Sequence, residues 1–190
     1  MKNICVFGSS SESIDKEYLN TAESLGRALA ERGYHMIFGA GKYGVMGAAA
    51  RGVKAVKGTF TGVSPEFFTE LDVLDYDCTE LIFTKTMRER KGVMEDKADA
   101  FVICAGGIGT FEEFFEVITL KQLGQHNKPI VIYNVNGYYD HMLGMMRASV
   151  EEKFMSEKVC RLYSVACSED EVFEQLENYE PFTYSKYDKE

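Results

Sequence analysis

The chain has 190 residues, 45% of them hydrophobic and 27% charged, which fits one globular domain and argues against a disordered or fibrous protein. The 21 lysines and arginines against 30 aspartates and glutamates give a net charge of −9, which argues against a nucleic-acid partner but allows a local site for a small anion. No apolar run reaches the length of a membrane span or a secretory signal, so we expect a cytoplasmic protein without a membrane partner.

Short β-branched and aromatic runs alternate with longer helical patterns, which is typical of a parallel sheet with helices on both faces. The pattern predicts strands at residues 3–7, 34–38, 59–63, 79–84, 100–104, 129–134 and 160–165. It predicts helices at 14–32, 44–57, 86–98, 110–125, 138–154 and 168–179. We therefore expect an α/β, Rossmann-like doubly wound domain over residues 1–183, with an irregular connection at 64–78 and a charged tail at 184–190.

Cysteine and histidine spacings give no sign of a metal site or a disulfide framework. The five cysteines include no C-x-x-C pair, so we expect reduced core residues, at Cys5, Cys78, Cys104, Cys160 and Cys167. The three histidines have no carboxylate or cysteine at ligand spacing, so we expect surface or packing roles for His35, His126 and His141. No metal and no cofactor is predicted.

Three predicted strands are followed by loops rich in glycine or hydroxyl groups, at Gly8–Ser11, Gly39–Gly44 and Ala105–Thr110. Ligands of doubly wound sheets bind beyond the carboxyl ends of the strands, so we expect all three loops to open on one edge. The loops match neither the Walker A pattern nor the full G-x-G-x-x-G register, which disfavours ATP and NAD.

The third of these loops is the most informative. Its glycines let the backbone approach a ligand closely, and Thr110 is predicted to begin a helix whose free N–H groups favour a phosphate. A tight strand-to-helix turn without a ligand explains the glycines about as well. Glu113 follows Thr110 by three residues, so a helix capping box competes with a catalytic role for this carboxylate.

The helix predicted at 86–98 places a cation on its buried stripe, because Arg90 lies between Met87 on one side and Val93 and Met94 on the other. A buried guanidinium needs an anion, which either a protein carboxylate or a ligand can supply. Elsewhere, Thr119 sits in an apolar helical run where its hydroxyl can bond back to the backbone. The helically spaced methionines at 142, 145 and 146 indicate core or a subunit interface.

Met87-x-x-Arg90-Lys91 followed by Gly106-Gly107-x-Gly109-Thr110-x-x-Glu113 resembles the paired signature of the LONELY GUY (LOG) family of cytokinin riboside 5′-monophosphate phosphoribohydrolases. Further segments resemble the family in the same order, so the resemblance covers nearly the whole chain: Ser9–Ser11, Gly39–Gly47 and Asn136–Asp140.

The resemblance implies a homodimer that cleaves the base from AMP or an N6-prenylated AMP, with Arg90 and Glu113 in the catalytic positions. Glu113 would stabilise an oxocarbenium-like sugar, and Arg90, which does not readily lose a proton, would hold the nucleotide. The implied substrate-binding set is Ser9, Met87, Lys91, Gly106, Gly107, Ile108, Gly109, Thr110 and Thr119. The chain departs from the family at Ala105, where a proline is usual, which puts loop rigidity and substrate preference in question.

Two other functions compete with this one. A carrier or sensor on the same fold, like the molybdenum-cofactor carriers, would bind a nucleotide and leave it intact. Lysine decarboxylation, a label that relatives of the family bear, requires pyridoxal phosphate and a suitably placed lysine, for which the sequence offers no arrangement.

Overall fold

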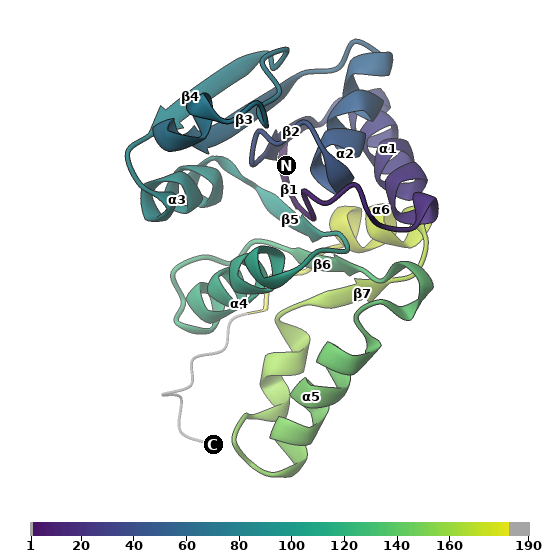
Figure 1. Ribbon diagram of the computed structural model, residues 1–190. Coiled ribbons are helices and arrows are strands. Elements are labelled where there is room, and N and C mark those ends of the chain that lie inside the picture. The colour runs from purple at the N-terminus through teal and green to yellow at the C-terminus, as the bar shows by residue number, and fades with distance from the viewer. Residues whose placement is uncertain (1, 183–190) are drawn as a thin grey trace.

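Seven parallel strands form one sheet in this structure, a computed structural model that describes residues 2–182. The strands are β1 (Asn3–Phe7), β2 (His35–Phe38), β3 (Phe60–Pro65), β4 (Glu80–Thr84), β5 (Ala100–Ile103), β6 (Ile130–Tyr133) and β7 (Ser164–Ala166). Their order is β4-β3-β2-β1-β5-β6-β7, from the top of Figure 1 downward. This arrangement confirms the predicted α/β, Rossmann-like fold. The predicted tail at 184–190 lies outside the described residues.

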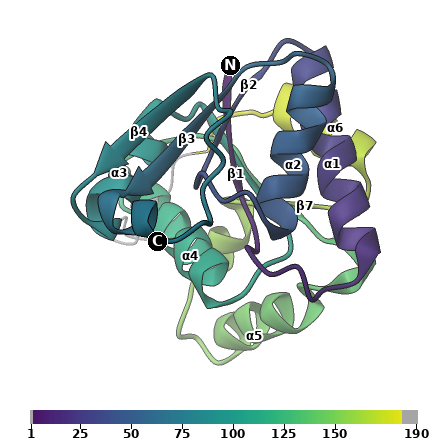
Figure 2. The same cartoon turned by 45° about the horizontal axis from the view of Figure 1, so that its top comes forward.

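Helices cover both faces of the sheet, as the two views in Figures 1 and 2 show. Those of the described chain are α1 (Lys16–Glu31), α2 (Gly44–Ala55), α3 (Met87–Lys97), α4 (Ile108–Gln122), α5 (Asp140–Glu151) and α6 (Glu169–Glu177). One apolar cluster joins a face to α1, α2 and α6 through residues such as Leu25, Ala49 and Phe173. The other joins the opposite face to α3, α4 and α5.

The central strand β1 contributes to both clusters. Ile4 and Val6 belong to the cluster under α1, α2 and α6, whereas Cys5 and Phe7 belong to the cluster under α3, α4 and α5. Successive strand side chains point to opposite faces, so a strand covered on both sides is apolar throughout. This explains why the strands are continuous apolar runs in the sequence.

The strand order reverses between β1 and β5. From β1 the chain winds outward to β2, β3 and β4, then returns to β5 on the other side of β1 and continues to β6 and β7. The connections that leave β1 and β5 therefore diverge to opposite faces, and a crevice opens at the carboxyl ends of these two strands. The fold thus places the predicted ligand edge at this point.

Several predicted boundaries are wrong. The helix predicted at 110–125 begins earlier, at Ile108, because Phe111 N already donates to Gly107 O. In the predicted strand at 160–165, the first residues belong to the 3₁₀ helix η3 (Glu157–Arg161), and only Ser164–Ala166 pair with β6. The irregular connection predicted at 64–78 contains the end of β3 and a 3₁₀ helix, η1 (Glu66–Glu70).

The cysteines are all free thiols, and Cys5 and Cys104 are buried as predicted. Cys167 is exposed, so the prediction of a core position is wrong there, because it lies in the short connection between β7 and α6. Of the helices described, none is long and apolar enough to cross a membrane.

Candidate active site

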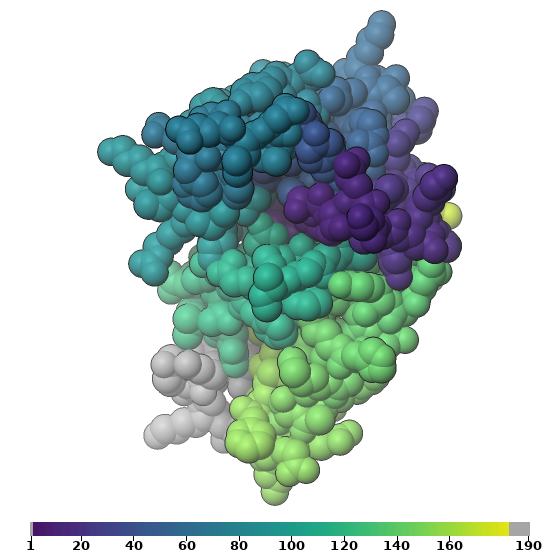
Figure 3. Space-filling view, in the orientation of Figure 1, coloured from purple at the N-terminus to yellow at the C-terminus, as the bar shows by residue number. Residues whose placement is uncertain are grey.

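A cleft of about 570 Å³ opens at the carboxyl edge of the sheet. The loops that follow β1, β2 and β5 all contribute to it, together with the β3–β4 connection and the start of α3. In Figure 3 the purple segment after β1 lies beside the green start of α4 and the blue β3–β4 connection. The volume is in the range of small-molecule sites, and the three predicted loops do open on one edge.

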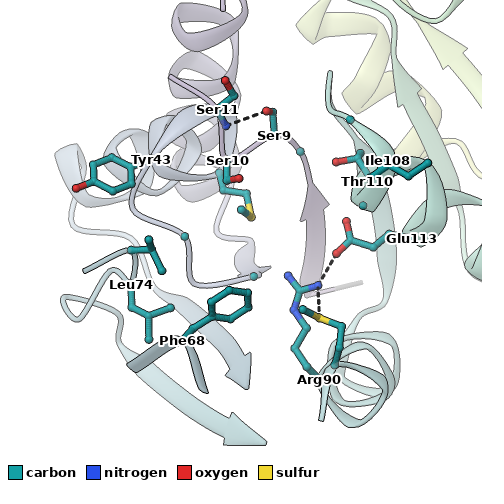
Figure 4. A pocket seen from close by; sticks show the side chains of 18 residues that line it. Ser9, Ser10, Ser11, Tyr43, Phe68, Leu74, Arg90, Ile108, Thr110 and Glu113 are labelled. Carbon is teal, nitrogen blue, oxygen red and sulfur yellow. Dashed lines mark hydrogen bonds and ion pairs between the residues drawn. The ribbon is translucent and has the colours of Figure 1, made fainter. Parts of the chain in front are cut away.

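Arg90 and Glu113 form a buried ion pair in the wall of this cleft (Figure 4). Arg90 Nη1 donates to Glu113 Oε1 at 2.5 Å, and Arg90 Nε donates to Val63 O at 3.3 Å. A protein carboxylate therefore supplies the anion that buried Arg90 requires. The cation of α3 and the carboxylate of α4 meet across the switch point.

Glu113 is not part of a capping box. Helix α4 begins at Ile108 with Gly107 as its N-cap, so Thr110 is already inside the helix and cannot be the cap that the box requires. Burial raises the pKa of the Glu113 carboxyl, and the Arg90 guanidinium opposes that rise by favouring the ionised form. The Glu113 carboxylate thus points toward the cleft and does not cap its own helix.

The N-terminus of α4 faces the cleft without a side-chain cap, because Gly107 has no side chain to accept from its first N–H groups. Ile108, Gly109 and Thr110 line the cleft beside it. Free N–H groups and the helix dipole make such an end a site for phosphate. Gly106 lies behind this surface, where a Cβ would meet Thr110 Oγ1 at 2.1 Å.

Two tyrosines hold the glycine loop from behind. Tyr139 OH donates to Cys104 O at 2.8 Å, and Tyr138 OH donates to Gly106 O at 2.7 Å. Their hydroxyls bind one carbonyl within the loop and one just before it, and neither tyrosine lines the cleft. The Asn136–Asp140 segment therefore acts on the site from outside the cleft.

The opposite wall is largely apolar. Tyr43, Phe68 and Leu74 face Ile108, Thr110 and Glu113 across the opening in Figure 4. Phe68 lies in η1, and the backbone at Leu74 pairs with Gly41 in an isolated bridge. Phe68 and Leu74 were not predicted from the sequence, because the irregular connection that carries them has no period or motif.

Most of the predicted site residues line the cleft, namely Ser9, Met87, Arg90, Gly107, Ile108, Gly109, Thr110 and Glu113. The others are not among the lining residues. Gly106 supports the loop from behind, Thr119 is exposed further along α4, and Lys91 pairs with Glu112 and Glu116 outside the cleft.

Fold and site together define an α/β protein of the Rossmann type with a small-molecule-sized cleft at its switch point, beside the uncapped N-terminus of α4. The family model described as "Possible lysine decarboxylase" matches residues 46–176. The chain belongs to the LONELY GUY (LOG) family of cytokinin riboside 5′-monophosphate phosphoribohydrolases.

Similar proteins come from plants and bacteria. Cytokinin riboside 5′-monophosphate phosphoribohydrolase LOG of Oryza sativa is 36% identical over 95% of this chain and 74% of that protein. The enzyme of the same name from Mycobacterium tuberculosis is 38% identical over 74% of this chain and 75% of its own. A molybdenum-cofactor carrier protein from Chlamydomonas reinhardtii shares the fold, with a TM-score of 0.70 and 22% identity over 93% of this chain and 95% of that one.

Pyridoxal phosphate, which a lysine decarboxylase uses, does not fit the cleft. It needs a lysine for its Schiff base, and among residues 2–182 no lysine lines the cleft. The nearby Lys42 pairs with Asp72. Lys91 is likewise held outside by its glutamate partners. The donor set of this site therefore gives no support to decarboxylation.

Proposed function

We propose that this protein hydrolyses the N-glycosidic bond of AMP or an N6-modified AMP, releasing the free base and ribose 5-phosphate. The observation that carries the proposal is the Arg90–Glu113 pair, buried in the cleft wall beside the uncapped end of α4. The names of the relatives, which describe phosphoribohydrolases, support the same reaction.

The 5′-phosphate binds at the start of α4 in this proposal. The N–H groups of Ile108, Gly109 and Thr110 and the helix dipole attract an anion there. Ser9 Oγ lies on the facing loop, where it accepts from Ser11 N at 3.0 Å. The net charge of −9 makes such a local donor set necessary, since the surface as a whole repels anions.

The ribose then lies against Glu113, one helical turn after Thr110. Cleavage develops positive charge on the sugar, which a nearby carboxylate stabilises in a water-poor site. Water adds its hydroxyl to C1′ as the bond to the base nitrogen breaks, and the proton that water loses balances the proton gained by the departing base. Arg90 favours the ionised form of Glu113 and fixes its position, because a guanidinium stays protonated throughout.

The base faces the apolar wall. Tyr43, Phe68 and Leu74 lie across the cleft from Glu113, so a base attached to a ribose at Glu113 points toward them. Apolar and aromatic side chains suit a purine ring and an apolar N6 substituent. The proposal therefore includes both AMP and its prenylated derivatives.

The test is incubation with a panel of nucleoside 5′-monophosphates and chromatographic detection of free base. We expect release of adenine from AMP or of the base from an N6-prenylated AMP. Adenosine serves as the control, and its hydrolysis is expected to be much slower because it has no phosphate for α4. Binding of every nucleotide without release of any base would contradict the proposal and indicate a carrier.

A further inference from the structure

Lys91 follows Arg90 on α3, but its side chain leaves the cleft and reaches α4. Its ammonium pairs with Glu112 and, at 2.6 Å, with Glu116 Oε2. The Lys91 side chain is only 11% exposed, so these pairs are partly shielded from water. Two ionic links thus join the same two helices, Arg90–Glu113 in the cleft wall and Lys91–Glu112/Glu116 beside it.

These ion pairs are important because α3 and α4 pack against the sheet more than against each other. The main backbone contacts of α3 are with β3, β4, β1 and β2, and those of α4 are with β1. Side chains therefore determine how closely the two helices approach at the level of the cleft. The ion pairs of Lys91 lie directly beside the Arg90–Glu113 pair, and the proposed reaction depends on the spacing of that pair.

The Lys91 ammonium is surrounded by carboxylates, so it is the positive charge that holds α3 and α4 together at this point. Glu95 lies one turn further along α3, and its pKa is raised to about 7 by burial and next by Glu116. Glu112 and Glu116 approach from α4. Without the ammonium, the carboxylates of α4 would face a glutamate of α3 and lose the cation that pairs with them, and like charges repel.

We propose that Lys91 is a positioning residue that holds α3 against α4 and so keeps Arg90 and Glu113 at their 2.5 Å separation. It acts through that pair and does not touch the substrate. This inference rests on the hydrolysis proposed above, and it differs from the substrate contact that the family resemblance implies for Lys91.

The experiment compares Lys91→Met, Lys91→Arg and Lys91→Glu with the charge-swapped double variant Lys91→Glu/Glu116→Lys. Loss of positioning alone lowers kcat and leaves KM nearly unchanged, so we expect Lys91→Met to lose about 10-fold or more in kcat. Lys91→Arg keeps the cation and retains most of the activity. The double variant restores the bridge with reversed charges and recovers activity that Lys91→Glu loses.

Two results would overturn the inference. One is a rise in KM with unchanged kcat in Lys91→Met, which marks a direct substrate contact. The other is a folded charge-swapped variant that is no more active than Lys91→Glu.

A stability readout separates this inference from the proposed function. Urea unfolding of Lys91→Met, Glu116→Gln and their combination tests the bridge without any substrate, and we expect the combination to lose less than the two single losses added. Additive losses would contradict the bridge. If the wild-type protein hydrolyses no nucleotide but the losses are non-additive, the proposed function fails and the bridge stands.

Discussion

The Arg90 guanidinium is bound by the Glu113 carboxylate and by Val63 O. On a third side it lies against the backbone of Gly39. A Cβ added at Gly39 would lie 1.8 Å from Arg90 Nη2, a distance that no pair of unbonded atoms tolerates. Gly39 therefore makes room for the guanidinium at the end of β2. At Gly41, by contrast, a Cβ would meet the flexible end of Met46, with Cε at 2.7 Å.

Gly39→Ala is expected to displace the guanidinium and lower turnover by about 10²-fold, because misplacing a reacting group by about 1 Å can cost that much. Steady-state kinetics on AMP measure the effect, with Gly41→Ala as the matched control. We expect the control to stay within about 5-fold of wild type, since the Met46 side chain can move aside. Equal losses in both variants would show that the loop as a whole, and not Arg90, is responsible.

The sequence predicted the burial of Arg90 but not its partner. Helical periodicity places Arg90 on one stripe with Met87, Val93 and Met94. In the fold Arg90 and Met94 are buried, whereas Met87 is 38% exposed. Glu113 is 23 residues away, and its local pattern with Thr110 suggests a capping box instead. The ambiguity disappears only when the start of α4 is known, since a box requires Thr110 at the cap.

At the scale of elements, the segment between β6 and α5 supports the glycine loop. The hydroxyl of buried Tyr139 donates to the carbonyl of Cys104, whereas Tyr138, which binds Gly106 O, is partly exposed. The chain turns here through positive φ values at Asn136 (54°) and Gly137 (68°), a conformation that favours asparagine and glycine. This turn brings both rings under the loop.

Tyr139→Phe is expected to lose about 1–3 kcal/mol of unfolding free energy, because it leaves a buried carbonyl without a donor. Tyr138→Phe is the control and is expected to lose less than about 1 kcal/mol, since Tyr138 is 39% exposed and its hydroxyl gives up less buried surface than that of Tyr139. Urea denaturation measures both. A loss in Tyr138→Phe as large as that in Tyr139→Phe would contradict the assigned roles.

The connection between α4 and β6 contains a histidine, His126, that is kept neutral. His126 Nε2 donates to Val117 O, and Nδ1 accepts from Lys128 N. Burial is the main cause that lowers its pKa from 6.5 to about 4. The unfolded chain binds the proton more tightly, so the stabilising contribution of the neutral ring is complete above pH 6.5 and is lost as pH falls toward 4.

We expect the unfolding free energy to fall between pH 6.5 and 4 by an amount that His126→Gln reduces. His126 accounts for about 1–2 kcal/mol of this fall in unfolding free energy, after allowance for the solvent around its half-buried ring. Urea denaturation at several pH values measures it. His141→Gln, at the exposed start of α5, is the control. The same pH dependence in wild type and His126→Gln would contradict the account.

Elements with a clear period were predictable, and those formed by tertiary contacts were not. The apolar runs of β1 and β5 and the long patterns of α1 and α2 were found close to their true positions. The apolar run at 160–165 looked like a strand, but Ser156 caps a 3₁₀ helix there by accepting from Lys158 N. Only contact with β6 decides where β7 begins.

At the scale of the whole molecule, the sequence predicted which loops meet but not what lies opposite them. Parallel strands bring their carboxyl ends to one edge, so the loops after β1, β2 and β5 had to gather there. The wall at Phe68 and Leu74 comes from a connection whose path is set by tertiary contacts, among them the backbone bridge between Leu74 and Gly41 and the Lys54–Asp75 ion pair. The base side of the cleft could therefore be seen only in the fold.

We propose that two copies of the chain form a homodimer through exposed apolar side chains. Phe154 is 89% exposed and Met145 57%, both in or just after α5. Met146 is buried in the core, so only part of the methionine group is available to a partner. Sedimentation equilibrium at micromolar concentration is expected to show twice the chain mass of 21.4 kDa. A single species at the chain mass would contradict the dimer.

In the proposed mechanism the Glu113 carboxylate is the group that promotes cleavage, and Glu113→Gln tests this role most directly. Glutamine has the same size and can still accept from Arg90, but it has no charge to stabilise a developing oxocarbenium. We expect a folded variant with a melting temperature near that of wild type and retained AMP binding. Its release of adenine is expected to be slower by about 10²-fold or more. Release at a near wild-type rate from this folded variant would contradict the mechanism.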